Sequence, residues 1–100
     1  MKVFHKLLTG IGDYLNRPKS RMLYAVTGGK YLGEFFIYME TVDDKHMFLS
    51  LPHMELREVP IIKFNFAVNN KILDPVESVP RDVYKLCKAQ YKTTTNAINN

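Results

Sequence analysis

The chain has 100 residues, of which 46% are hydrophobic and 24% are charged, and it carries a formal net charge of +4. This size and composition suit one small domain with a single core and leave no room for a second. The uninterrupted apolar runs, such as residues 35–39, are far shorter than the roughly 18 to 20 residues of a membrane-spanning helix, so we expect no contact with a membrane.

The N-terminal stretch and the cysteine count bear on the compartment. His5 and Lys6 interrupt the first apolar residues, so the sequence lacks the core of a secretory signal, and we expect a cytoplasmic protein. Cys87 is the only cysteine, which excludes an internal disulfide and a Cys-x-x-Cys metal or redox pair.

The charge is unevenly distributed along the chain. Residues 1–30 hold six basic residues and one acidic residue, a net charge of +5. Residues 31–80 hold four basic and eight acidic residues (−4), and residues 81–100 hold four basic residues and one acidic residue (+3). Basic ends around an acidic middle suit an anionic partner such as nucleic acid, and ordinary solvated surface explains them equally well.

The first half of the chain reads as a helix followed by strands. Apolar residues recur at steps of three and four, which predicts an amphipathic helix over residues 2–16. Residues 22–27 have strand composition, and Gly28-Gly29 predicts a two-residue hairpin turn. Residues 30–41 then predict a long second strand with a bulge or bend at Gly33.

The second half continues with strands and ends in a helix. After a polar turn at residues 42–45, residues 46–51 predict a third strand, which residues 54–59 continue less regularly. Residues 61–68 alternate apolar and polar positions around Asn65, which predicts a half-buried fourth strand. Asn69-Asn70 indicates a turn and residues 71–73 a short fifth strand. Pro80 stands near the start of a C-terminal helix over about residues 79–93, and a polar tail follows at 94–100.

These elements predict a mostly β fold. We expect a small, five-stranded, strongly bent antiparallel open barrel with strands over about residues 21–76, an N-terminal helix and an added C-terminal helix. An open barrel leaves strand edges that must be covered or paired, which favours an oligomer. The edge strand that we nominate is the apolar fourth strand, with Ile61, Ile62, Phe64, Phe66 and Val68.

One segment resembles a known family. Residues 23–38 are similar to the first motif of Sm-like (LSm/Hfq-type) RNA-binding proteins, in which a turn glycine and a second glycine five residues later begin a bent strand, as Gly28 and Gly33 do. The family's acidic residue and following loop correspond approximately to Glu40, Lys45 and His46, and Asn69-Asn70 stands in place of its Arg-Gly turn. The resemblance implies a ring of five to seven identical subunits, joined by their fourth and fifth strands, that binds single-stranded RNA around a pore.

The resemblance implies two base-binding segments in each subunit, and the charges suggest a third site. The predicted RNA-binding residues are Glu40, Lys45, His46, Asn69, Asn70 and Lys71, although ordinary turn chemistry explains these residues too. The densest basic cluster is Arg17, Lys19 and Arg21, which we expect to contact phosphates unless it is a solvated connector. On the last helix, Lys85, Lys88 and Lys92 share a polar face that is typical of solvent exposure, with at most an auxiliary role.

No motif in the sequence indicates catalysis or a cofactor. Asp43-Asp44 is ordinary turn composition, the three histidines lack metal-ligand spacing, and Gly28-Gly29-Lys30 lacks the upstream glycine of a phosphate-binding loop. We therefore expect a non-enzymatic protein without metal or cofactor, possessing one of two functions. The first is RNA binding, in RNA chaperoning or regulation, and the alternative is an oligomeric protein-interaction or assembly module that binds no RNA.

Overall fold

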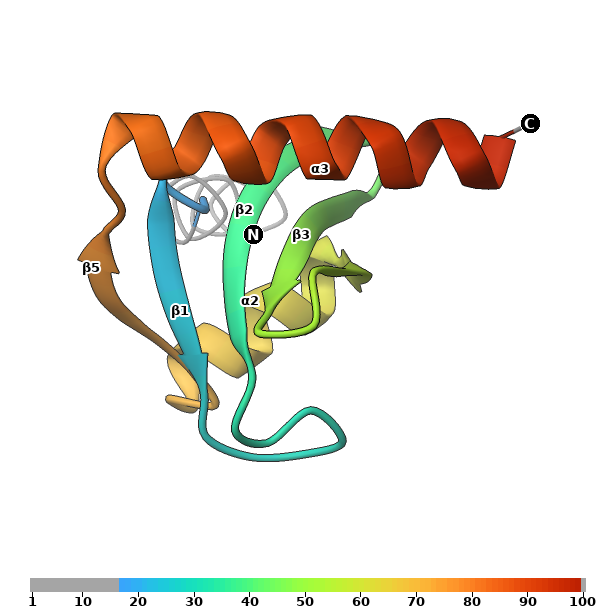
Figure 1. Cartoon of the computed structure of the whole chain (residues 1–100). Coiled ribbons are helices and arrows are strands. Elements are labelled where there is room, and N and C mark those ends of the chain that lie inside the picture. The colour runs from blue at the N-terminus through green and yellow to red at the C-terminus, as the bar shows by residue number, and fades with distance from the viewer. Residues whose placement is uncertain (1–16, 100) are drawn as a thin grey trace.

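Five antiparallel strands form one open sheet in the order β4-β3-β2-β1-β5 (Figure 1). The computed structural model describes residues 17–99, so the helix predicted over residues 2–16 lies outside the described residues. The strands are β1 (Met22–Val26), β2 (Phe35–Val42), β3 (Lys45–Leu51), β4 (Glu55–Pro60) and β5 (Leu73–Ser78), and the helices are α2 (Ile61–Asn69) and α3 (Arg81–Asn99). The mostly β, five-stranded antiparallel prediction is confirmed.

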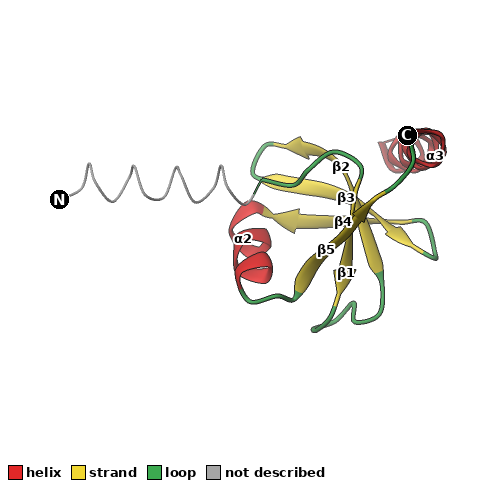
Figure 2. Ribbon diagram, turned by 90° about the vertical axis from the view of Figure 1, so that its left-hand side faces the viewer, coloured by secondary structure: helices red, strands yellow, loops and turns green. Residues whose placement is uncertain are grey.

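The central strands are apolar on both faces because a helix covers each face. Figure 2 shows α2 and α3 on opposite sides of the strands. On β3, Met47 and Leu49 belong to the core beneath α3, whereas Phe48 between them belongs to the core beside α2. Coverage of both faces explains why residues 46–50 are all buried and why their sequence does not alternate.

Helix α3 lies across one face of the sheet. Its residues Cys87 and Tyr91 are buried against Met39 and Leu49 from the central strands. The helix continues to Asn99, beyond the predicted end near residue 93, so residues 94–99 are helical rather than a tail. No helix within residues 17–99 combines the length and the apolar character needed to cross a membrane.

The segment predicted as the fourth strand is the helix α2, and this is the main correction to the sequence analysis. The nominated edge residues Ile61, Ile62, Phe64, Phe66 and Val68 all lie on this helix. Phe64 is fully buried, whereas Ile62 and Phe66 are 83% and 62% exposed, a helical pattern rather than the period of two that a strand requires. The true fourth strand is β4, in the segment that was expected only to continue the third.

Gly28, Gly29 and Gly33 all lie in the loop between β1 and β2, which differs from the predicted two-residue turn and bent strand. The two-residue turn predicted at Gly28-Gly29 is an eight-residue connection, residues 27–34, between β1 and β2. Gly29 (φ 80°) and Gly33 (φ 92°) both adopt left-handed conformations in this loop, so Gly33 lies before the second strand rather than inside it. The irregularity in β2 falls instead at Met39, where the register with β3 shifts.

The remaining boundaries differ in detail. The polar turn at residues 42–45 is confirmed, with Asp43 in the left-handed region (φ 56°). The fifth strand begins at Leu73 and runs to Ser78, beyond the predicted residues 71–73. It pairs with β1, which places β4 and β5 at the two edges of the sheet.

Candidate nucleic-acid interface

The predicted residue His46 is buried at the start of β3. His46 is only 6% exposed, and the centroid of its ring lies 4.9 Å from the ring centroid of Phe64 on α2. His46 Nδ1 is 2.7 Å from Thr41 Oγ1, which is 2.7 Å from Tyr38 Oη. The imidazole therefore anchors the hairpin to α2 and does not present an open face on which a base would stack.

Burial lowers the pKa of His46, and the positive charge of Arg17 lowers that pKa further. The folded chain thus favours the neutral imidazole, while the unfolded chain takes up a proton near the ordinary pKa of about 6.5. The unfolded state binds more protons between these two values, so stability rises with pH there. The contribution of neutral His46 is complete above about pH 6.5 and is lost as the pH falls through the folded-state pKa.

The two other predicted hairpin residues have protein partners. Lys45 Nζ lies 3.5 Å from Glu58 Oε2, and both side chains are about half exposed, so this ion pair adds little to stability. Glu40 Oε2 accepts a hydrogen bond of 2.6 Å from Tyr91 Oη on α3. Burial raises the pKa of Tyr91, and the hydrogen bond to Glu40 and the charge of Glu40 raise that pKa further, so Tyr91 remains a donor.

The second predicted segment, residues 69–71, ends the helix α2. The backbone N–H of Lys71 donates to the carbonyl of Val68 (3.1 Å), and that of Ile72 donates to the carbonyl of Ala67 (2.7 Å). This is the hydrogen-bond pattern of a Schellman motif. Lys71 takes the left-handed position of this motif (φ 58°), whereas Asn70 has φ −100°.

The structure does not bring the two predicted base-binding segments together. The N–H of Ile61 donates to the carbonyl of Asp44 (2.9 Å), so α2 begins beside the β2–β3 turn. Residues 69–71 lie at the other end of this nine-residue helix, which is about 13 Å long at a rise of 1.5 Å per residue. The amide Nδ2 of Asn70 donates to the carbonyl of Phe66 (2.7 Å), which uses part of its capacity to read a base.

Of the predicted phosphate-contacting residues, Arg17 and Lys19 are exposed and Arg21 is partly buried. Arg17 is exposed and near enough to His46 to affect its pKa. The backbone of Arg21 adopts the left-handed conformation (φ 64°). Its side-chain Nη1 donates to the carbonyl of Val79 (3.4 Å), next to the start of α3.

Sequence reasoning missed a groove beside α2. This α2 groove has a volume of about 420 Å³ and lies between α2, the β1–β2 loop, the end of β4 and the start of β5. Buried apolar side chains of Val26, Phe36 and Leu73 contribute to its wall, and Lys30 and Lys63 line it as well. No local sequence signal marks this groove because its lining comes from segments that are far apart in the chain.

An ion-pair network holds the loop on one side of the α2 groove. Arg57 Nε and Nη2 lie 3.2 Å and 3.3 Å from the two carboxylate oxygens of Glu34, and the buried hydroxyl of Ser50 donates to the same carboxylate. The guanidinium also lies over the ring of Tyr31, 4.2 Å from its centroid. Burial acts to raise the pKa of Glu34, but the hydrogen bonds from Ser50 and Arg57 and the charge of Arg57 outweigh burial and lower it.

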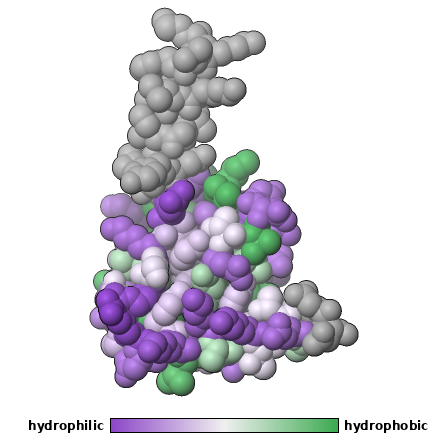
Figure 3. All heavy atoms as spheres, turned by 90° about the horizontal axis from the view of Figure 1, so that it is seen from above, coloured by the Kyte–Doolittle hydropathy of each residue, from purple (hydrophilic) through white to green (hydrophobic). Residues whose placement is uncertain are grey.

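Helix α3 presents a second concentration of charge. Figure 3, which looks onto α3, shows hydrophilic residues along this helix. Its exposed cations are Arg81, Lys85, Lys88 and Lys92, which we call the cation strip. Lys88 and Lys92 border a hollow of about 310 Å³ that is also lined by Met39, Glu40 and Tyr91. Glu40 is thus the one predicted base-binding residue that lies beside the strip.

Within residues 17–99, no group of three or more His, Cys, Asp or Glu side chains is placed to hold a metal ion. No family model, curated protein or solved structure matches this chain.

Proposed function

We propose that this chain is a non-enzymatic, Sm-like protein that assembles into a homo-oligomeric ring of five to seven copies and binds single-stranded RNA. The observation that carries the proposal is the strand order. The six-residue strands β4 and β5 are the two edges of the described sheet, and they lie at opposite ends of its order. Pairing of β4 in one copy with β5 in the next is a heterologous contact that repeats around a closed ring.

The charges support an RNA partner. Residues 17–99 contain twelve Lys or Arg and nine Asp or Glu. The ion pairs within this part of the chain engage Lys45 and Arg57, while the four cations of the cation strip are exposed. Cations that are not neutralised by neighbouring carboxylates are available to phosphates, which supply most of the non-specific affinity for nucleic acid.

A specific observation favours the alternative function. Ile62 and Phe66 project from one side of α2 and are 83% and 62% exposed, and exposed apolar side chains of this size are typical of protein contacts. A protein-interaction or assembly module with the same sheet would use this face and would bind no RNA.

Two measurements on one sample separate these functions. Light scattering gives the mass of the purified chain, and titration of labelled oligo-U and oligo-A at about 50 and 200 mM salt gives the affinity and its salt dependence. A ring-sized mass with affinity that falls steeply with salt is the expected result. A ring without RNA binding would favour the interaction module, and a monomer would refute the ring.

A matched pair of variants tests the edge contact. Val76 on β5 is 53% exposed and Leu32 in the β1–β2 loop is 66% exposed, so Glu at either position should change the stability of a single copy little. We expect Val76→Glu to dissociate the ring by placing a charge in the β4–β5 contact, and Leu32→Glu to leave the mass unchanged. Equal masses for both variants would contradict assembly through β5.

A further inference from the structure

We infer that the cation strip of α3, and not the hairpin and turn residues, is the surface that holds the RNA backbone. The inference rests on the proposed function and names the site at which that function is performed. Arg81, Lys85, Lys88 and Lys92 follow one another at steps of four, three and four residues. At 3.6 residues per turn these positions fall within an arc of about 60° on the helix surface.

The length of the strip and the order of its cations suit the phosphate backbone of a nucleic-acid strand. At a rise of 1.5 Å per residue, the four Cα atoms span about 16.5 Å along the helix axis, in steps of about 6, 4.5 and 6 Å. The single acidic residue of α3, Asp82, falls outside this arc by the same geometry. Successive cations along a straight element face successive phosphates of an extended strand, and such contacts do not depend on sequence.

The strip stands on a rigid base. Cys87 and Tyr91 are 4% and 5% exposed and lie between the cationic positions along the helix. Tyr91 Oη also donates to Glu40 on β2, which ties the middle of α3 to the sheet. Because the helix backbone is held on the core, binding has to order only the cationic side chains and not the helix itself, and this reduces the entropy lost on binding.

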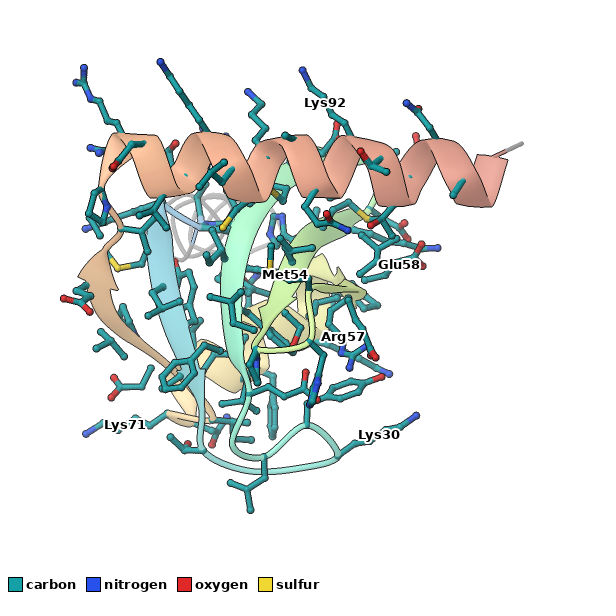
Figure 4. All side chains as sticks on the ribbon, in the orientation of Figure 1. Lys30, Met54, Arg57, Glu58, Lys71 and Lys92 are labelled. Carbon is teal, nitrogen blue, oxygen red and sulfur yellow. The ribbon has the colours of Figure 1, made fainter. Side chains whose placement is uncertain are left out.

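The cations at the other end of the molecule are a weaker candidate. Figure 4 shows Lys92 extending away from the sheet on α3, whereas Lys30 and Lys71 extend from the opposite end. Lys30 Nζ lies 5.4 Å from the ring centroid of Tyr31, and Lys63 lines the α2 groove together with the carboxylate-bearing Glu58. Lys71 belongs to the helix cap described above, so these three lysines come from three different segments, whereas the cations of the strip share one face of a single helix.

The hollow beside the strip favours a single strand over a duplex. It opens next to Lys88 and Lys92 and has a volume of about 310 Å³. An unpaired base can turn away from the backbone into a concave surface, whereas the bases of a duplex stay stacked inside. The expected ligand is therefore single-stranded RNA with its phosphates on the strip.

The salt dependence gives the expected magnitude. Each phosphate contact to a single strand contributes about −0.7 to the slope of log K against log salt, so four contacts give about −2.8. Between about 50 and 200 mM salt, this slope corresponds to a loss of affinity of roughly 50-fold. Removal of three contacts should make the slope less steep by about 2. The loss of affinity over the same range of salt should then be only about threefold.

The experiment compares two triple variants of the full chain with equal net charge. One is Lys85→Gln, Lys88→Gln, Lys92→Gln in the strip, and the other is Lys30→Gln, Lys63→Gln, Lys71→Gln at the opposite end. Each variant is titrated with a labelled oligo-A of about ten nucleotides. Two competitors are then added separately, a duplex of the same length and polyglutamate. Circular dichroism checks that both variants are folded, as we expect because all six lysines are exposed.

The inference and the proposed function fail in different ways. We expect the strip variant to lose both affinity and salt slope, and the control variant to retain them. If the unaltered chain binds no oligo-A, the proposed function is overturned. If it binds but the control variant loses as much slope as the strip variant, the strip is overturned as the site while RNA binding stands. Equal competition by duplex or by polyglutamate would overturn single-stranded RNA as the partner of the strip.

Discussion

Replacement of Phe64 by alanine tests the helical assignment of residues 61–69. Phe64 is fully buried and its ring lies among three aromatic residues, with centroid distances of 5.7 Å to Tyr24, 5.7 Å to Phe48 and 4.9 Å to His46. A fully buried Phe contributes roughly 1.5 to 3 kcal/mol by removal from water. The cavity left by truncation raises the expected cost of Phe64→Ala to about 3 to 5 kcal/mol.

The same helix supplies the controls. Ile62 and Phe66 are 83% and 62% exposed, so Ile62→Ala and Phe66→Ala should each cost less than about 1 kcal/mol. The assay is urea denaturation followed by circular dichroism, with the free energy of unfolding extrapolated to water. Since a small domain has only about 5 to 15 kcal/mol in total, Phe64→Leu serves as a milder variant if Phe64→Ala does not fold.

The pattern across these positions decides between helix and strand. On a strand, positions 62, 64 and 66 share one face, so all three substitutions would cost similar amounts. On α2, Phe64 alone of the three is buried, and the costs should differ by about 2 kcal/mol or more. Similar losses at Ile62 and Phe64 would refute the helical reasoning and restore the strand.

Three further predictions concern stability. Lowering the pH from about 7.5 to 5 should reduce the free energy of unfolding in urea titrations, and His46→Phe should flatten this dependence; an unchanged profile would contradict the role given to neutral His46. Arg57→Met should cost about 2 to 3 kcal/mol because it leaves Glu34 partly buried without its cation, and adding Glu34→Gln should recover part of this in a double-mutant cycle. Lys71→Gly should stabilise the chain by up to about 1 kcal/mol and raise Tm, since glycine adopts the left-handed cap without strain; Lys71→Ala, which keeps the strain, should give no gain.

The error over residues 61–69 has a physical explanation. Phe64, Asn65 and Phe66 alternate as in a strand, but Ile61, Phe64 and Val68 also recur at helical steps, so the segment carries both periods. Pro60 before the segment and the asparagines after it are signals for the ends of a helix. The choice depends on the pocket that Tyr24, His46 and Phe48 form for Phe64, which exists only in the folded sheet.

The candidate site, like the fold, was predictable only in part from the sequence. The spacing of Lys85, Lys88 and Lys92 placed them on one face of a helix, and the structure extends this row to Arg81. The burial of His46 could not be foreseen, because its partner Phe64 is brought to it by the turn from β4 into α2. The α2 groove and the Glu34–Arg57 pair were equally hidden, since their members are joined by sheet pairing rather than by neighbouring positions.

The sequence alone determined the features that depend on neighbouring residues. These are the polar turn at Asp43-Asp44, the strands around residues 22–26 and 46–51, and the helix after Pro80, where local propensity and periodicity agree. Tertiary structure decided that residues 61–69 form a helix, how long the fifth strand is, and which strands are the two edges of the sheet. Each of these depends on contacts between distant segments, such as β1 with β5, whose energies are absent until the chain has folded.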